Sequence, residues 1–540
     1  MRNKIFMVLL LTMALMVGTV GIASASGILV FAISLDVDQL DPGNTSIGQV
    51  VDNIFEGLVK YKAGTTSIQP CLATSWEISA DGKEITFHLR KGIKFHDGTD
   101  FNADAVVFSF ARQYDPNHPY HQYGKWFYWG YMFSDIIVVK KIDDYTVKLV
   151  LKRPNVSILT SLALYQVSMV SPTNAEKYNE DAFKHPCGTG PFKFVEWVKD
   201  DYITLEANED YWGERANLDK LIFKVIPDPS ARLMALEVGE VQGIEYPNPV
   251  DFDRINDNKD LVLMTQPGMN VGYLAINTGY GYKDDNKNGV RDPDEPWVKT
   301  PGYFEPLTKK KVRQAINMAI DKQSIVDNIY MGTAIKAKNG MPPFMLGYND
   351  DIEDYSYDPE RAKELLAEAG YPDGFEATLH VMPVSRSYMF DPPKIGEAIQ
   401  SYLAAVGIKV KFYQVDWSSY LQETKDGKHQ ICLLGWTGDN GDPDNFMNGL
   451  YGTNGASLGI AGNRAFYIND TAQELLSAAL ATYDDEKRVT YYKKVQEMIH
   501  EDAAWVYLVH STQNMVFKNN IKGFILSPTG RVFFYPVWVE

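Results

Sequence analysis

The chain has 540 residues, of which 45% are hydrophobic and 22% are charged. This length and composition exclude a disordered or low-complexity protein and predict two to four domains. The formal net charge is -17, so neither nucleic acid nor an anionic membrane surface is expected to be the main partner.

The N-terminus has the pattern of an export signal. Arg2 and Lys4 precede an apolar run, and Ala23-Ser24-Ala25 then offers small residues where a signal peptidase cleaves. We predict a signal peptide over residues 1–25, cleaved after Ala25; a retained membrane anchor is the alternative. No cysteine follows the apolar run, so we expect no lipid anchor. A free exported protein fits a periplasm best.

Strand and helix patterns alternate along the rest of the chain. An Asp81-Gly82 turn between two alternating segments predicts a β-hairpin over 76–89. Asp358-Pro359 predicts the start of a helix, and an apolar stripe predicts another over 395–406. The continuous apolar run 431–434 predicts a strand covered on both faces of its sheet. Together these elements indicate an α/β fold.

The segment that follows this apolar strand is the candidate ligand site, because ligands of such sheets bind beyond the carboxyl ends of strands. Its glycines allow close backbone approach, and its tryptophan offers apolar area with a polar end. One of its carboxylates could hold an ammonium group. A solvated turn is the alternative, and we expect Asp442 and Asp444 to be turn and cap residues. The segment contains Gly435, Trp436, Thr437, Asp439, Asp442 and Asp444.

Motifs throughout the chain resemble those of the extracellular solute-binding proteins of family 5. Met382-Pro383-Val384-Ser385-Arg386 and the segment 435–446 resemble the branch that carries dipeptides. Motifs shared with the family as a whole lie at 76–92, 188–192, 211–213, 268–274 and 347–351.

The resemblance implies an α/β fold, a two-lobed clamshell of the periplasmic-binding-protein kind with an inserted satellite domain. Lobe I would be discontinuous, and lobe II would be one continuous stretch. The implied segments are 26–56, 190–281 and 510–540 for lobe I, 57–189 for the satellite domain, and 282–509 for lobe II.

The resemblance also implies a dipeptide held between the lobes, with Arg386 on its carboxylate and Asp439 on its α-ammonium. A guanidinium grips a carboxylate through two parallel hydrogen bonds. Fixing both termini measures ligand length, because each residue adds about 3.3–3.6 Å to an extended peptide. The residues expected to line the same cleft are Gly435, Trp436, Thr437 and Tyr388.

The implied function is non-catalytic delivery of dipeptides to an ABC-type permease in the inner membrane. We expect a monomer that requires no cofactor and binds no nucleic acid. Longer oligopeptides, haem or another solute are alternatives within the family. A secreted hydrolase is an alternative of a different class, for example a glycosidase using carboxylates of 439–444. The sequence lacks a serine-hydrolase elbow and a zinc-protease helix motif, which favours the binding protein.

The cysteines depart from the pattern of the dipeptide branch, whose cysteine pairs have no counterparts at matching positions. Three cysteines allow one bridge at most. Because they occur in apolar or turn contexts, we predict that Cys71, Cys187 and Cys432 are unpaired, buried thiols.

An acidic segment over 284–295 is not explained by the resemblance. Its spacing matches a twelve-residue calcium loop with Gly289 as the turn glycine. Arg291 departs from the usual apolar residue, so a solvated acidic loop is the alternative to a structural Ca²⁺ site. The ligands would be Asp284, Asn286, Asn288, the carbonyl of Val290, Asp292 and Glu295.

Overall fold

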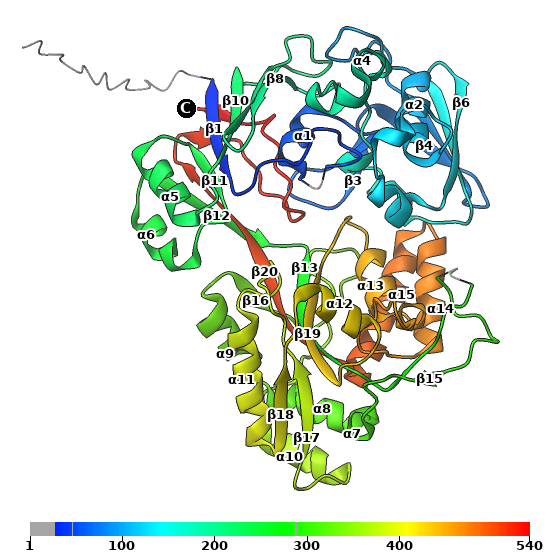
Figure 1. The fold of residues 1–540 in the computed structure, drawn as a ribbon, viewed down its shortest axis with the longest axis vertical. Helices are drawn as coiled ribbons and strands as arrows, with labels where there is room; N and C mark the ends of the chain where they lie inside the picture. The colour runs from blue at the N-terminus through cyan, green and yellow to red at the C-terminus, as the bar shows by residue number, and fades with distance from the viewer. Residues whose placement is uncertain (1–26, 46, 287–288) are drawn as a thin grey trace, which may run out of the picture.

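The computed structural model describes residues 27–45, 47–286 and 289–540. The predicted signal peptide therefore lies outside the described residues. The molecule has two lobes along its long axis, with a satellite domain beside the first (Figure 1). It mixes helices with one large sheet, which confirms the predicted α/β clamshell. Within the described residues, we find no helix with both the length and the apolar character that a membrane span needs.

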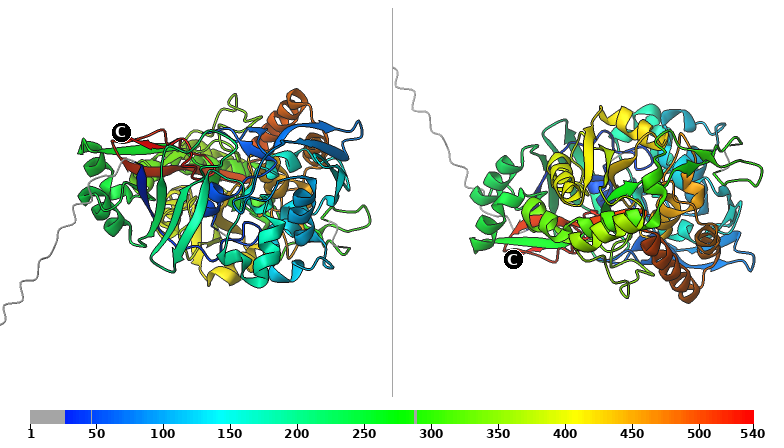
Figure 2. Two further views of the ribbon diagram at one scale, coloured as in Figure 1. Left: turned by 90° about the horizontal axis from the view of Figure 1, so that it is seen from above. Right: turned by 90° about the horizontal axis from the view of Figure 1, so that it is seen from below.

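One twelve-stranded sheet runs through both lobes, and β20 lies at its centre. Figure 2 shows helices of lobe II on both sides of the part of this sheet that contains β20. In spatial order the path is β18 (Ile408–Tyr413), β17 (Phe375–His380), β19 (Ile431–Thr437), β13 (Asn270–Ile276), β20 (Trp505–Lys518), β11 (Gly243–Glu245), β1 (Ile28–Ile33), β10 (Lys220–Val225), β9 (Tyr202–Ala207) and β8 (Phe192–Val198), while β12 (Leu261–Pro267) and β16 (Ala334–Lys336) also pair with β20.

Two antiparallel segments cross between the lobes. The first half of β20 pairs with β13, and its second half pairs with β12 and β11. Between β12 and β13, the N–H of Gly268 donates to the carbonyl of Ser511 at 2.9 Å, and the N–H of Met269 donates to Pro528 at 2.8 Å. We call 267–270 and 509–512 the crossing. It is the narrow connection about which two lobes can rotate.

The buried hydrophobic side chains fall into separate clusters that follow the lobes. The satellite cluster contains residues between Leu58 and Cys187, and the lobe II cluster contains residues between Met269 and Val509. Two further clusters in lobe I combine N-terminal, middle and C-terminal segments. The exact domain limits stay a prediction. However, β13, which we assigned to lobe I, pairs with β19 and packs in the lobe II cluster.

Helices cover the sheets of all three parts. The satellite domain is built on a four-stranded antiparallel sheet of β4 (Ala73–Ile78), β5 (Glu84–Leu89), β7 (Thr146–Leu151) and β6 (Ile136–Asp143), with α2 (Ala103–Tyr114), α3 (Ser157–Ser161), α4 (Pro172–Tyr178) and the ribbon of β2 (Val59–Tyr61) and β3 (Ile68–Pro70). Lobe I adds α1 (Gly48–Ile54), α5 (Pro229–Val238), α6 (Phe252–Asp257) and the ribbon of β21 (Ile521–Lys522) and β22 (Trp538–Val539). Lobe II adds α7 (Glu305–Thr308), α8 (Lys310–Ala319), α9 (Lys322–Ile325), α10 (Pro359–Glu368), α11 (Pro392–Ala405), α12 (Trp417–Lys425), α13 (Asp444–Tyr451), α14 (Asp470–Ala481), α15 (Asp485–Asp502) and the ribbon of β14 (Tyr280–Gly281) and β15 (Val298–Lys299).

Local sequence signals predicted several of these elements correctly. β4 and β5 form the expected hairpin. Helix α10 begins at Pro359, and the carboxylate of Asp358 accepts the N–H of Arg361 at 2.9 Å, as an N-cap does. The three cysteines are buried and unpaired, as predicted.

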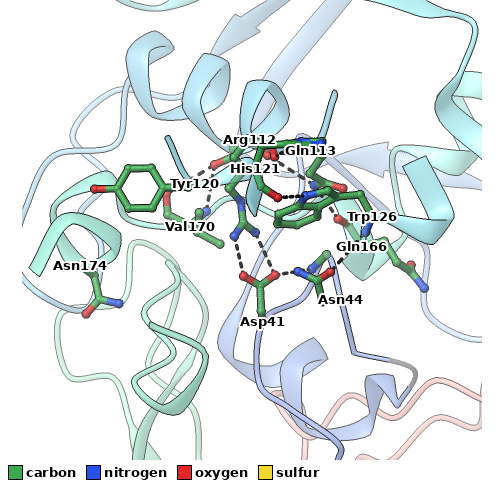
Figure 3. Close-up of polar contacts among 12 residues, drawn as sticks. Asp41, Asn44, Arg112, Gln113, Tyr120, His121, Trp126, Gln166, Val170 and Asn174 are labelled. Carbon is green, nitrogen blue, oxygen red and sulfur yellow. Dashed lines mark hydrogen bonds and ion pairs between the residues drawn. The ribbon is translucent and has the colours of Figure 1, made fainter. Parts of the chain in front are cut away.

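A polar network fastens the satellite domain to lobe I (Figure 3). The guanidinium of Arg112 donates to both carboxylate oxygens of Asp41, at 2.5 and 3.1 Å, and lies 5.0 Å from the ring centroid of Trp126. The indole N–H of Trp126 donates to the carbonyl of His121 at 2.7 Å. Bidentate pairing and stacking make this a geometrically specific contact. Lobe I and the satellite domain therefore form one unit, against which lobe II can move.

Candidate functional site

Two glycines shape the floor of the site near the end of β19. Gly435 is the register partner of Gly272 in β13. A Cβ atom on Gly435 would lie 2.2 Å from Cδ2 of Tyr388, and one on Gly272 would lie 2.3 Å from the Tyr388 carbonyl oxygen. Both glycines thus leave space for Tyr388, which packs onto the strand pair and is only 8% exposed. Burial raises the pKa of Tyr388 to about 12.

Arg386 lies on a tight turn held by this packing. Its N–H donates to the carbonyl of Met389 at 3.0 Å, and the N–H of Met389 donates back at 2.9 Å. The guanidinium is exposed, and its carbon lies 4.7 Å from the ring centroid of Trp417. Stacking on the face of an aromatic ring orients a guanidinium while the N–H groups at its edge can still bind a planar anion.

Ser387 joins this turn to β19 and to the crossing. Its hydroxyl lies 3.1 Å from the hydroxyl of Thr437, and its carbonyl accepts the hydroxyl of Ser511. The amide oxygen of Asn270 accepts the Ser511 N–H at 2.8 Å. The structure therefore brings Arg386 beside the exposed Thr437, two residues before Asp439, next to the crossing.

Asn445 organises the loop that carries Asp439. Its side-chain oxygen accepts the indole N–H of Trp436 at 2.9 Å and the backbone N–H of Asp439 at 3.0 Å. Trp436 and Asp439 are both partly exposed. Burial raises the pKa of Tyr128 in the satellite domain, and the negative charge of Asp439 raises it further. The Asp439 carboxylate therefore lies within electrostatic reach of the satellite domain.

The same loop makes direct contacts between lobe II and the satellite domain. The side-chain amide of Asn440 donates to the hydroxyl of Ser161 at 2.8 Å. The N–H of Gly441 donates to the phenol oxygen of Tyr61 at 3.3 Å. These two hydrogen bonds join lobe II directly to the satellite domain, as in a closed arrangement of the two lobes.

Asp442 has a structural role, as predicted for a turn residue. Both of its carboxylate oxygens accept Nη2 of the buried Arg488, at 2.6 and 2.8 Å, and one also accepts the N–H of Asp444 at 2.9 Å. Asp444 is the first residue of α13 rather than its cap. Burial, with the charge of Asp442 second, raises the pKa of Asp444 to about 7.

Sequence reasoning singled out the charged residues of this site but missed those that hold them. Asn445 and Ser387, which hold the two segments, were not selected, and neither was Tyr128, which lies within electrostatic reach of Asp439. Asn445 and Ser387 are common polar residues without a distinctive spacing. Tyr388 was expected to line the cleft, and its ring is instead mostly covered by Gly435 and its neighbours.

In the acidic segment, the described residues 284–286 and 289–295 are linked by hydrogen bonds to their own carboxylates. Asp284 accepts the N–H of Gly289 at 2.8 Å, and Gly289 has a φ of +78°. The two oxygens of the buried Glu295 accept the N–H groups of Asp285 at 2.9 Å and Asp292 at 3.0 Å.

Calcium binding by this loop stays a prediction. Among the other expected ligands, Asn286 donates to Asp292, and Val290 is 36% exposed. Asn288 lies outside the described residues. Within the described residues, no group of three or more His, Cys, Asp or Glu side chains is arranged to hold a metal.

Two lobes joined by crossing strands, with Arg386 and Asp439 on segments hydrogen-bonded to the crossing or next to it, have the arrangement of a solute-binding protein of the clamshell type. Residues 67–457 match the family described as "Bacterial extracellular solute-binding proteins, family 5 Middle". The chain therefore belongs to family 5 of the bacterial extracellular solute-binding proteins, which confirms the resemblance seen in its motifs.

Relatives within the family differ in their named ligands. The chain is 39% identical to the "Dipeptide-binding protein" of Escherichia coli (strain K12), covering 90% of this chain and 89% of that one. It is 37% identical to "Heme-binding protein A" of Haemophilus influenzae, covering 92% and 88%. Among solved structures, it is 35% identical to the periplasmic binding protein DppA of Helicobacter pylori in complex with the peptide STSA, with a TM-score of 0.72 and coverage of 95% and 98%.

Proposed function

We propose that this protein captures dipeptides by their two charged termini and delivers them to an ABC-type permease. The observation that carries the proposal is the position of the Arg386 turn. Ser387 holds this turn against Thr437, two residues before Asp439. A cation and a carboxylate from separate segments of lobe II thus lie on neighbouring parts of the chain, Arg386 next to Ser387 and Asp439 two residues after Thr437.

The physical chemistry of these groups suits a short zwitterion. Arg386 can take a carboxylate in two parallel hydrogen bonds, and Asp439 can accept from an ammonium group. Closure of the lobes excludes water and strengthens both contacts. Peptide backbone between the two termini can pair with protein backbone without reading side chains, which gives length selectivity with sequence tolerance.

The comparisons support the solute class and make ligand length the property to test. The Escherichia coli relative is named for dipeptides, whereas the Helicobacter pylori relative was solved with the peptide STSA. Two fixed termini allow one backbone length only, because each further residue adds about 3.3–3.6 Å.

The remaining assignments follow from this role. We propose a monomeric, non-catalytic protein exported to the periplasm, cleaved after Ala25 and without a lipid anchor. It would need no cofactor for ligand binding and would have an inner-membrane permease as its protein partner. The domain limits given from the sequence are retained as part of the proposal.

Haem is the second candidate ligand, because of the similarity to the Haemophilus influenzae protein. Titration of haem into the purified protein, followed by its Soret absorbance, tests this candidate. A saturable spectral change that dipeptides do not reverse would favour haem over the dipeptide.

Calorimetry with Ala-Ala tests the proposal. We expect Arg386→Gln and Asp439→Asn each to weaken binding by about 2–5 kcal/mol, because each leaves one ligand charge unpaired in a closed site. Arg254→Gln and Asp253→Asn change the same charges on the exposed face of α6 and should leave affinity unchanged. Native affinity in both site variants would remove these residues from the site.

A further inference from the structure

A second cavity lies between the satellite domain and lobe II, beside the site described above. Its volume is about 530 Å³. Asn440, Asp444 and Asn445 of the ligand-site loop form one wall. Asn445 also accepts the N–H of Asp439, so the ammonium site and this cavity share a residue. The remaining lining mixes serine and asparagine side chains, such as Ser134, with glycines and apolar residues such as Met132 and Leu480.

The charges around the cavity leave one carboxylate without an ion pair. Arg153 and Asp135 line it together and are paired with each other at 3.1 Å. Behind the wall, Asp442 is paired with Arg488. Asp444 has no ion pair among the described residues, and its enclosed Oδ1 has no hydrogen-bond partner there. With Asp444 ionised, the lining therefore has a net charge of one negative unit, and it has an unused acceptor in either state.

We propose that this cavity receives the cationic side chain of a lysine or arginine at the N-terminal position of the bound dipeptide, with Asp444 as its counter-ion. The inference rests on the proposed function, because Asp439 must hold the α-ammonium of that residue. The long stem of lysine or arginine would then pass Asn445 into the cavity.

The electrostatics of Asp444 favour a cation there. Burial and the nearby Asp442 raise its pKa to about 7, while the hydrogen bond from Asn448 and the charges of Arg488 and Arg153 oppose that rise. A bound cation would restore the ionised form, since an opposite charge within a few ångströms stabilises a carboxylate. The negative charge of Asp444 thus becomes available when a cationic ligand enters.

Calorimetry at pH 8 with four dipeptides tests the inference. Lys-Ala is compared with norleucine-Ala, which has a similar length without the charge, and with Ala-Ala and Ala-Lys. We expect Lys-Ala to bind at least tenfold more tightly than norleucine-Ala. Asp444→Asn should abolish this preference and leave Ala-Ala within twofold of its native affinity. Glu486→Gln, a matched change on the exposed side of α15, should preserve the preference.

The outcomes separate this inference from the proposed function. Equal affinities for Lys-Ala and norleucine-Ala, or a preference that survives in Asp444→Asn, would overturn it. An equal preference for Ala-Lys would overturn the assignment to the N-terminal residue. Binding of putrescine alone, lost in Asp444→Asn, would assign the cavity to free diamines instead. Failure of Ala-Ala to bind the native protein would refute the proposed function itself.

Discussion

Replacing Gly435 by alanine should damage ligand binding through Tyr388, although Gly435 itself offers no side chain to a ligand. The new Cβ would lie 2.2 Å from the Tyr388 ring and 2.4 Å from the carbonyl oxygen of Val271. Both distances are far below van der Waals contact, and the second atom is backbone of the paired strand. Overpacking of this kind costs about 1–3 kcal/mol of folding stability.

The strain should pass to the turn that carries Arg386, because Tyr388 lies within that turn. We expect at least a tenfold loss of dipeptide affinity, or about 1.4 kcal/mol, together with a lower melting temperature. Calorimetry and thermal denaturation measure the two effects. Gly130→Ala is the control: a Cβ there meets nothing within 4 Å, and at this exposed helical position of the satellite domain it should be neutral or stabilise by up to about 1 kcal/mol.

A double-mutant cycle shows whether the effect of Gly435→Ala acts through Tyr388. Tyr388→Ala removes the ring, so Gly435→Ala should destabilise less in that background than in the native protein. Contacting residues typically show coupling of about 0.5–3 kcal/mol. Strict additivity, or native affinity in Gly435→Ala, would refute the packing argument.

Four further predictions concern ligand, motion, metal and pH. N-acetylated or C-amidated dipeptides should bind more weakly than free ones in calorimetry, because each modification deletes one charge; equal binding of tri- to pentapeptides would contradict the length argument. Small-angle scattering should show a smaller radius of gyration with saturating dipeptide, because closure brings the lobes together; an unchanged value would argue against closure. If the 284–295 loop holds calcium, the ion at 100 times its dissociation constant should stabilise the folded state by about 2.7 kcal/mol, and Glu295→Gln should abolish the shift in melting temperature that chelator reverses. Because the pKa of Asp444 is raised in the fold to about 7, its contribution to stability is present at low pH and is lost as pH rises from about 4 to about 7. The melting temperature of Asp444→Asn minus that of the native protein should therefore increase between pH 5 and pH 7.5. A constant difference would contradict the raised pKa of Asp444.

Local chemistry made part of the fold predictable from the sequence. The cap at Asp358 and the hairpin of β4 and β5 depend on residues a few positions apart, so a short window contains all the information. The apolar run that became β19 was recognisable for the same reason. The rule that ligands bind beyond strand ends led us to predict the ligand site after β19, and that site stays a prediction.

Long-range pairing accounts for what the sequence could not show. Gly435 makes room for Tyr388 only because β19 pairs in register with β13, which puts Gly272 opposite it. The ion pair of Asp442 with Arg488 joins residues 46 positions apart, and no local pattern links them. The limit of lobe I near 281 was drawn without knowledge of that pairing, which joins β13 to β19 of lobe II.

The loop after β19 contains the proposed ligand charge Asp439 between contacts to the crossing and contacts to the satellite domain. Gly438 donates its N–H to Met269 in the crossing at 2.8 Å, whereas Asn440 and Gly441 contact the satellite domain. Opening about the crossing must break the contacts of Asn440 and Gly441 but can preserve that of Gly438. Asp439 lies between these two kinds of contact, and Arg386 also belongs to lobe II. On the proposed assignment of Arg386 and Asp439, a dipeptide can engage both charges on the open lobe first, and closure then adds the satellite domain. This order predicts that the charges at the termini govern capture, while the contacts across the lobes govern how long the ligand stays.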